Sequence, residues 1–312
     1  MVWSCLVSIL PGMAQTEKLT DYVNPFVGTD GYGNVYPGAQ IPFGGIQISP
    51  DTDSRFYDAA SGYKYNHLTL MGFSLTHLSG TGIPDLGDFL FIPGTGEMKL
   101  EPGTHEDPDQ GYRSRYSHDK EWASPNYYAV ELADYGVKAE MTSGVRSGMF
   151  RFTYPESDNA FIMIDMNHTL WQSCEWSNLR MINDSTITGY KLVKGWGPER
   201  HVYFTATFSK KLTGLRFVQD KKPVIYNTSR FRSSYEAWGK NLMACISFDT
   251  KAGEEVTVKT AISAVSTDGA RNNMKELDGL TFNELRAKGE ALWEKELGKY
   301  TLTADRKTKE TF

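Results

Sequence analysis

The sequence is poor in cysteine, in long apolar runs and in basic residues. Its 312 residues include three cysteines, and 33 Lys and Arg against 38 Asp and Glu give a formal net charge of −5. This mild negative charge argues against a nucleic-acid-binding protein, whose surface carries a basic excess. No run of about 18 apolar residues is present, so the sequence predicts no membrane-spanning helix. A chain of this length buries a large core without metal or disulfide support.

Short motifs of several enzyme classes are also missing. There is no Gly-x-Ser-x-Gly around a nucleophilic serine, and no glycine-rich loop has the spacing that binds phosphate. No histidine pair has the i, i+4 spacing of a helical zinc site, and no Cys–His set has metal-site spacing. We therefore expect no metal site in this chain and hydrogen-bonded, structural roles for its histidines. These are His67, His77, His105, His118, His168 and His201.

Residues 1–14 resemble the end of a secretory signal peptide. They hold a short apolar run and then small residues of the kind that a signal peptidase prefers, although the usual basic start is missing. The alternative is an N-terminal strand. Cys5 would leave with the signal. Cys174 and Cys245 would then either pair in an oxidising compartment or, as we expect, stay buried free thiols.

The middle of the chain is dominated by strand patterns. Apolar side chains occupy alternate positions in residues 201–208 and 255–262, which is typical of a strand with one face in the core and one in water. Turn-forming residues separate many further candidates. The sequence predicts a mostly β fold, with a large antiparallel β-sandwich over residues 19–268. The other predicted strands are 41–49, 88–92, 126–132, 137–142, 146–154, 160–166, 186–193, 214–218 and 241–248.

Helical patterning begins only near residue 270. Residues 281–297 place apolar side chains near helical spacing, with charged residues between them. Thr281 and Glu284 form a capping-box pattern at its start. We expect this helix to leave Leu292 and Trp293 partly exposed.

The last residues predict further elements. Residues 300–303 are predicted to form a short strand, and residues 305–312 the start of another helix. We expect residues 269–312 to be a helical linker that leads into a domain outside this sequence.

Two glycine-rich segments, residues 24–50 and 79–88, contain the densest loop material. Glycine and proline at this density indicate tight turns and close backbone approach. Two such loops close together in sequence favour a ligand-binding rim, and sandwich corners are the alternative. The residues expected to shape the second loop are Gly80, Gly82, Asp85 and Asp88.

Several aspartates are candidate acid or base groups. Hydrolysis of a glycosidic bond needs a proton donor and a base on opposite sides of that bond. Asp85 and Asp88 lie three residues apart and could converge, although capping of turns is the commoner role of such pairs. The full set of candidates is Asp51, Asp53, Asp58, Asp85 and Asp88.

Some aromatic residues are candidates for stacking on sugars. An aromatic ring offers a flat apolar surface to the C–H face of a pyranose, and core packing is the alternative for each. The candidates are Tyr57, Tyr63, Trp171, Trp176 and Trp196.

Several motifs occur here in one order over residues 19–93, and that order is highly specific. Together they resemble the N-terminal domain of glycoside hydrolase family 92, the calcium-dependent exo-acting α-mannosidases. The motifs are Asp21 to Thr29, Tyr36 to Ala39, Pro42-Phe43-Gly44, Ser49 to Thr52, Ser61-Gly62-Tyr63, and Gly72 to Gly82 with Asp85 and Asp88.

The resemblance implies a galactose-mutarotase-like supersandwich followed by linker helices. In the family an (α/α)6-type helical domain follows, which carries the catalytic acid, the base and most calcium ligands, and hydrolysis inverts the anomeric centre. No catalytic residue is therefore expected in this chain. The family's sandwich lends loops to the sugar pocket.

At one position the resemblance assigns a sugar contact. Tyr57 falls where family members often place a tryptophan against the terminal mannose, and Asp58 falls on the neighbouring aspartate. Tyr32 and Asn34 fall where some members carry histidines. The resemblance therefore implies substrate-binding roles for Tyr57 and Asp58, with a linkage preference that the tyrosine can alter.

Three hypotheses follow from these observations. The first is the N-terminal part of a secreted α-mannosidase, periplasmic or on the surface of a bacterium, which acts on mannose-containing glycans and is inactive without its helical domain. The second is a stand-alone carbohydrate-binding module. The third is a structural sandwich that touches no sugar.

Overall fold

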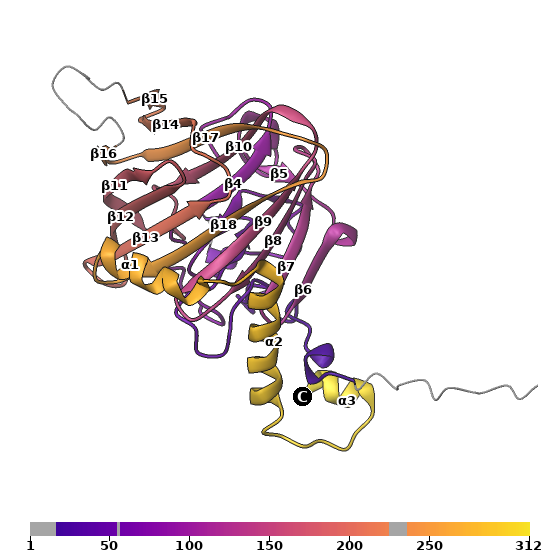
Figure 1. Ribbon diagram of the computed structural model, residues 1–312. Helices are drawn as coiled ribbons and strands as arrows, with labels where there is room; N and C mark the ends of the chain where they lie inside the picture. The colour runs from indigo at the N-terminus through magenta and orange to yellow at the C-terminus, as the bar shows by residue number, and fades with distance from the viewer. Residues whose placement is uncertain (1–16, 55–56, 225–235) are drawn as a thin grey trace, which may run out of the picture.

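The computed structural model describes residues 17–54, 57–224 and 236–312. Two large antiparallel sheets face each other, and helices follow at the C-terminal end (Figure 1). The mostly β sandwich predicted from the sequence is therefore confirmed, as are the helices after it. None of the described helices has the length and apolar character needed to cross a membrane.

The first sheet has seven strands in the order β1-β3-β4-β10-β17-β14-β15. All of its neighbouring strands pair antiparallel. Its strands are Ser49–Asp51 (β1), Gly72–Ser74 (β3), Leu90–Thr95 (β4), Ser157–Asp165 (β10), Leu242–Thr250 (β17), Gly214–Gln219 (β14) and Lys222–Pro223 (β15).

The second sheet has nine strands in the order β16-β11-β12-β13-β18-β9-β8-β7-β6. Thr69–Leu70 (β2) and Ser114–Arg115 (β5) form a separate small sheet. The nine strands are Glu236–Gly239 (β16), Ser173–Asn183 (β11), Thr186–Lys194 (β12), Arg200–Phe208 (β13), Glu254–Ser263 (β18), Ser147–Tyr154 (β9), Val137–Ser143 (β8), Tyr127–Leu132 (β7) and Glu121–Ser124 (β6).

The core lies between the two sheets and is rich in aromatic rings. Phe91 of β4 stacks near Phe150 of β9, with ring centroids 4.9 Å apart. Phe89 lies 4.5 Å from Phe204 of β13. The alternation in β13 and β18 buries the apolar face as predicted. The side chains buried by this alternation include Val202, Phe204, Ala206, Phe208, Val256, Val258 and Ile262.

Two predicted strands are wrong. Residues 41–49 are mostly loop, because the chain turns at Pro42-Phe43-Gly44, where Phe43 has φ 62°. Only Ile48, which bridges Ala39, and the start of β1 are extended and paired. Residues 300–303 form no strand, because none of the described strands pairs with them.

The C-terminal helices are Thr267–Met274 (α1), Phe282–Leu297 (α2) and Arg306–Thr311 (α3). The predicted capping box is present, because Glu284 N–H donates to Thr281 Oγ1 at 3.3 Å and Thr281 N–H donates to Glu284 Oε2 at 2.8 Å. Phe282 and Leu285 are buried against the nine-stranded sheet. Short 3₁₀ helices occur at Leu19–Tyr22 (η1), Tyr57–Ala59 (η2), Pro108–Gln110 (η3), His118–Lys120 (η4) and Lys275–Leu277 (η5).

The second half of α2 leaves the sheets and points away from them (Figure 1). Leu292 is 42% exposed, and Trp293 is half-buried and donates from Nε1 to the Gln40 carbonyl at 2.8 Å. The expected partial exposure of these two residues is therefore confirmed. Glu294 accepts from Thr20 N–H at 2.7 Å, which fastens η1 to the helix.

Candidate functional site

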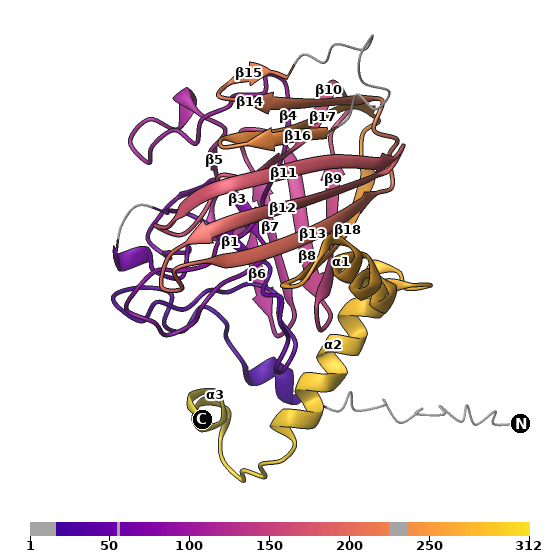
Figure 2. The same ribbon diagram turned by 90° about the vertical axis from the view of Figure 1, so that its left-hand side faces the viewer.

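Five loops meet at one edge of the sandwich, and we call this edge the loop rim. It consists of residues 24–48, 52–54 with 57–68, 75–89, 167–172 and 195–199. Figure 2 shows the loops of the N-terminal third of the chain, with η2, on the same side as the ends of β11, β12 and β13. Backbone hydrogen bonds join the loops, from Gly80 N–H to Asn34 O at 2.7 Å and from Leu170 N–H to Leu86 O at 3.0 Å.

Tyr57 lies on the loop rim with 57% of its surface exposed. A Cβ added at Gly82 would lie 3.1 Å from its hydroxyl, so the structure brings Tyr57 and Gly82 together. Gly80, in the same loop, has φ +71° and open space around it. Asp58 follows Tyr57 in η2, and its side chain lies outside the described residues. An exposed ring beside a residue without a side chain is a suitable surface for a sugar.

Asp85 and Asp88 each stabilise the 75–89 loop through hydrogen bonds or ion pairs. Asp85 accepts from its neighbour Leu86 N–H at 2.6 Å, and Trp196 N–H lies 3.4 Å from its second oxygen. Asp88 is fully buried between two cations, with Arg200 Nη1 at 2.6 Å and Lys191 Nζ at 3.2 Å. Asp88 thus holds the 75–89 loop against strands β12 and β13, and Asp85 holds it against the loop between them.

Asp51 forms a second buried network beneath the rim. Its two oxygens accept from His77 Nε2 and His168 Nε2, each at 2.8 Å. His77 Nδ1 lies 2.8 Å from the Gln47 carbonyl. His77 therefore links the Asp51 carboxylate to the backbone carbonyl of Gln47.

The pKa values of the two buried carboxyls are lowered. Burial raises the pKa of Asp51, but His77 and His168 outweigh it and keep that pKa below its usual range. Burial also raises the pKa of Asp88, and Lys191 and Arg200 outweigh it in the same way. A carboxyl held ionised in this way is poorly suited to donate a proton to a leaving group.

These lowered pKa values predict acid-sensitive folding. An unfolded Asp titrates near 3.8, so below about pH 4 the unfolded chain binds more protons and the free energy of unfolding falls. Each carboxyl contributes up to about 1.4 kcal/mol per pH unit. Urea unfolding at pH 4.5, 3.5 and 2.5 measures the slope. A stability that stays constant from pH 4.5 to 2.5 would mean that these carboxyls are not ionised in the folded chain.

Three of the five aromatic candidates lie around the rim and are exposed. Tyr57, Trp171 and Trp196 are 57%, 62% and 67% exposed. For Tyr63 the alternative of core packing holds, because its ring is buried and its hydroxyl donates to Glu121 Oε1 at 2.9 Å. Trp176 is exposed on β11, near Trp238 of β16, which sequence reasoning did not single out.

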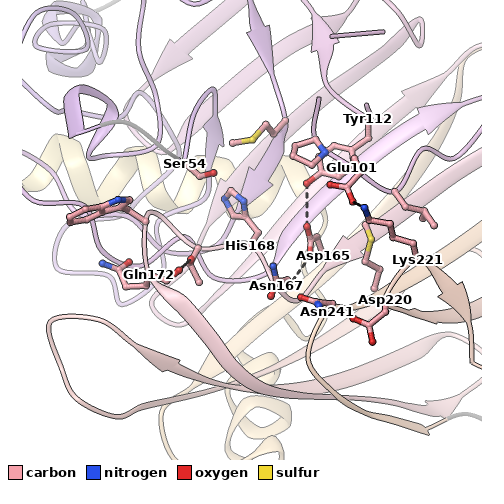
Figure 3. Close-up of a pocket in the computed structure, with 16 residues that line it drawn as sticks. Ser54, Glu101, Tyr112, Asp165, Asn167, His168, Gln172, Asp220, Lys221 and Asn241 are labelled. Carbon is pink, nitrogen blue, oxygen red and sulfur yellow. Dashed lines mark hydrogen bonds and ion pairs between the residues drawn. The ribbon is translucent and has the colours of Figure 1, made fainter. Parts of the chain in front are cut away.

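A cleft of about 920 Å³ adjoins the rim. Figure 3 shows Ser54, His168 and Gln172 on one side of it and Glu101, Tyr112 and Lys221 on the other. Its floor includes Asp165, which accepts from Tyr112 Oη at 3.2 Å and from Asn167 N–H at 2.8 Å. Sequence reasoning missed this cleft, because its residues come from distant segments that no local motif connects.

The two cysteines in the described residues are buried and free. Burial raises the pKa of both thiols, which makes them unreactive. The expectation of two buried thiols is confirmed, and Cys5 lies outside the described residues.

One group of possible metal ligands is present among the described residues, and sequence reasoning missed it. Asp53, His67 and His105 bring one ligand atom each to within 4.8 Å of one another. Calcium takes six to eight oxygen ligands, whereas two of these three ligands are imidazoles. The group therefore does not fit the calcium that the family resemblance implies.

Comparison with known proteins relates the sequence and fold of this chain to glycoside hydrolases. Residues 22–263 match the profile of the glycosyl hydrolase family 92 N-terminal domain. The chain therefore belongs to glycosyl hydrolase family 92 and carries its N-terminal domain.

Individual relatives agree with this assignment. An uncharacterized secreted glycosidase of Arthroderma benhamiae is 26% identical over 308 residues, which cover 90% of this chain and 38% of that protein. The structure of the family 92 glycosyl hydrolase ccman5 superposes with a TM-score of 0.78 and 26% identity, covering 92% of this chain and 38% of that one.

A further solved protein is similar in fold. It is a family 92 inverting mannosidase from Bacteroides thetaiotaomicron, with a TM-score of 0.79 and 23% identity over 96% of this chain and 39% of its own. The chain thus spans less than two fifths of the length of these relatives.

Proposed function

We propose that this domain forms one wall of the sugar pocket of an α-mannosidase that removes terminal α-linked mannose with inversion. The observation that supports this proposal is the exposed Tyr57 ring beside Gly82 on the loop rim. A pyranose has an apolar face and polar edges, and the rim offers an exposed ring for the first while the adjoining cleft offers polar side chains for the second.

The acid and base are proposed to lie in a helical domain that follows this one. Inverting hydrolysis needs two carboxyl groups about 6.5–9.5 Å apart with room for water. Asp51 and Asp88 are buried in ion pairs instead. The calcium expected from the resemblance is proposed to bind mainly in the same helical domain, because the group of Asp53, His67 and His105 offers two imidazoles where calcium takes oxygen ligands.

Secretion is part of the proposal, in a bacterial periplasm or on a cell surface. The signal-like residues 1–14 lie outside the described residues. The fungal relative is named a secreted glycosidase.

The test begins with the gene. A reading frame that continues past the codon for Phe312 into a long helical region supports the proposal. A stop codon directly after it contradicts hydrolysis and favours the stand-alone binding module.

Replacing Tyr57 by alanine in the whole protein is expected to lower kcat/KM for α-mannosides. Loss of one aromatic contact of about 0.5–1.5 kcal/mol corresponds to a drop of up to about tenfold. Tyr57→Phe keeps the ring and should retain most of the activity. The measurement is mannose release by each variant, with residues 1–312 alone expected to release none.

Trp238→Ala is the matched control, because Trp238 is a similarly exposed ring on β16. Equal activity of Tyr57→Ala and wild type would favour the purely structural sandwich. Release of mannose at enzyme-like rates by residues 1–312 would contradict the division of labour between the domains.

A further inference from the structure

Three metal-ligand side chains meet at the base of the loop that carries Tyr57. Asp53 is fully buried, and its Oδ2 lies 3.2 Å from His105 Nε2. The rings of His67 and His105 lie 3.9 Å apart between centroids. Both histidines are partly exposed, so the group opens to solvent on their side. The three residues come from separate segments, after β1, before β2 and between β4 and η3.

Each histidine is oriented by a threonine hydroxyl. His67 Nδ1 lies 3.0 Å from Thr52 Oγ1, and His105 Nδ1 lies 2.9 Å from Thr69 Oγ1. With Nδ1 on a hydroxyl, Nε2 is the nitrogen that coordinates an ion. A polar partner on the second nitrogen fixes the ring and its tautomer in most histidine metal sites.

The spacing and chemistry suit a small transition-metal ion. Ligand atoms of a tetrahedral zinc ion with bonds of about 2.0–2.1 Å lie about 3.3 Å apart, close to the 3.2 Å between Asp53 and His105. The widest pair, at up to 4.8 Å, would close on binding. Two imidazoles and one carboxylate, with a water in the fourth position, are the ligands of many zinc sites.

The positive charge of Arg113 lies next to this group and would repel a bound metal ion. Its Nη1 lies 3.5 Å from His105 Nδ1, the nitrogen that does not face Asp53. It also donates to Thr52 O at 2.5 Å and to Thr69 Oγ1 at 3.3 Å, so the guanidinium lies on the threonine side of the group. Asp53 offsets its charge, which leads us to expect moderate rather than very tight binding.

We propose that Asp53, His67 and His105 bind a divalent transition-metal ion of the zinc type. Asp53 and His67 flank residues 54–66, which carry Tyr57, and His105 belongs to another loop. The ion therefore ties both ends of the Tyr57 loop to the loop that precedes η3. This site is separate from the calcium of the resemblance, and it stands whether or not the protein hydrolyses mannosides.

The test is a zinc titration of the chelator-treated 312-residue chain by calorimetry. We expect one zinc ion per chain with a dissociation constant below about 10 µM, and no competition by calcium. His67→Gln and His105→Gln should each weaken binding by at least about 100-fold, since loss of an outer-shell partner alone costs 10–100-fold. His201→Gln, at an exposed histidine on β13, is the matched control and should bind as wild type does.

Two results would overturn the proposal. One is a wild-type chain that binds no zinc at 100 µM. The other is equal zinc affinity in wild type and both glutamine variants. If a variant fails to fold, cobalt(II) added to the wild-type chain decides the matter by NMR. The ring signals of His67 and His105 should then shift strongly while those of His201 do not, and the reverse pattern contradicts the site.

Discussion

Replacing Asp88 by asparagine is expected to lower the free energy of unfolding by about 3–5 kcal/mol. The change removes the negative charge between Lys191, which is fully buried, and Arg200. Lys191 Nζ also donates to the His168 carbonyl at 2.6 Å, but that neutral acceptor supplies no counter-charge. A buried ammonium without a counter-charge costs far more than the ion pair itself contributes.

Urea unfolding at pH 7 measures this loss. Asp184→Asn is the control, because Asp184 pairs with Lys211 on the surface, where such pairs contribute little. The double variant Asp88→Asn, Lys191→Met should be more stable than Asp88→Asn alone, because it also removes the buried Lys191 ammonium that has lost its counter-charge. A single variant as stable as wild type would show that Lys191 is neutral or solvated in the folded chain.

Replacing Gly62 by alanine is expected to destabilise the chain by about 2–5 kcal/mol. Gly62 has φ +86°, and left-handed backbone costs other residues roughly 1–2 kcal/mol. A Cβ would also overlap Oδ1 of Asp51 and lie 3.2 Å from Leu170. Two histidines hold that carboxylate in place, so it cannot move aside, and overpacking adds about 1–3 kcal/mol.

Gly253→Ala separates the two contributions. Gly253 has φ +75° and nothing within 4 Å of an added Cβ, so its replacement meets backbone strain alone. The difference between the two variants in thermal or urea unfolding therefore measures the clash with Asp51. Equal losses of unfolding free energy in both variants would mean that the Asp51 carboxylate and its histidines shift at little cost to accommodate the added methyl group.

Regular alternation made most strands predictable from the sequence. Strand β13 buries Val202, Phe204 and Phe208 on one face, as its pattern predicts. Strand β11 was missed, although it is the longest described strand. Its register shifts between Cys174 and Trp176 and again near its end, so bulges break the two-residue period that sequence reasoning depends on.

The site was predictable only where it follows a contiguous motif. The glycine-rich segments 24–50 and 79–88 predicted two of its loops, and Tyr57 was singled out only by the family resemblance. Asp53, His67 and His105 are 14 and 38 residues apart and meet only through the folding of three segments. Tyr63 could not be decided from the sequence, since a tyrosine in a loop motif gives no sign of whether its ring faces water or Glu121.

The order of strands in the nine-stranded sheet also determines when the domain can fold during synthesis on the ribosome. Strand β18 is the last in the chain, yet it is central in the sheet, between β13 and β9. Until Glu254–Ser263 has left the ribosome, the edges of β9 and β13 on either side have no partner. Any N-terminal portion of this chain that ends before β18 therefore leaves two half-sheets with exposed edges, which can pair with other chains.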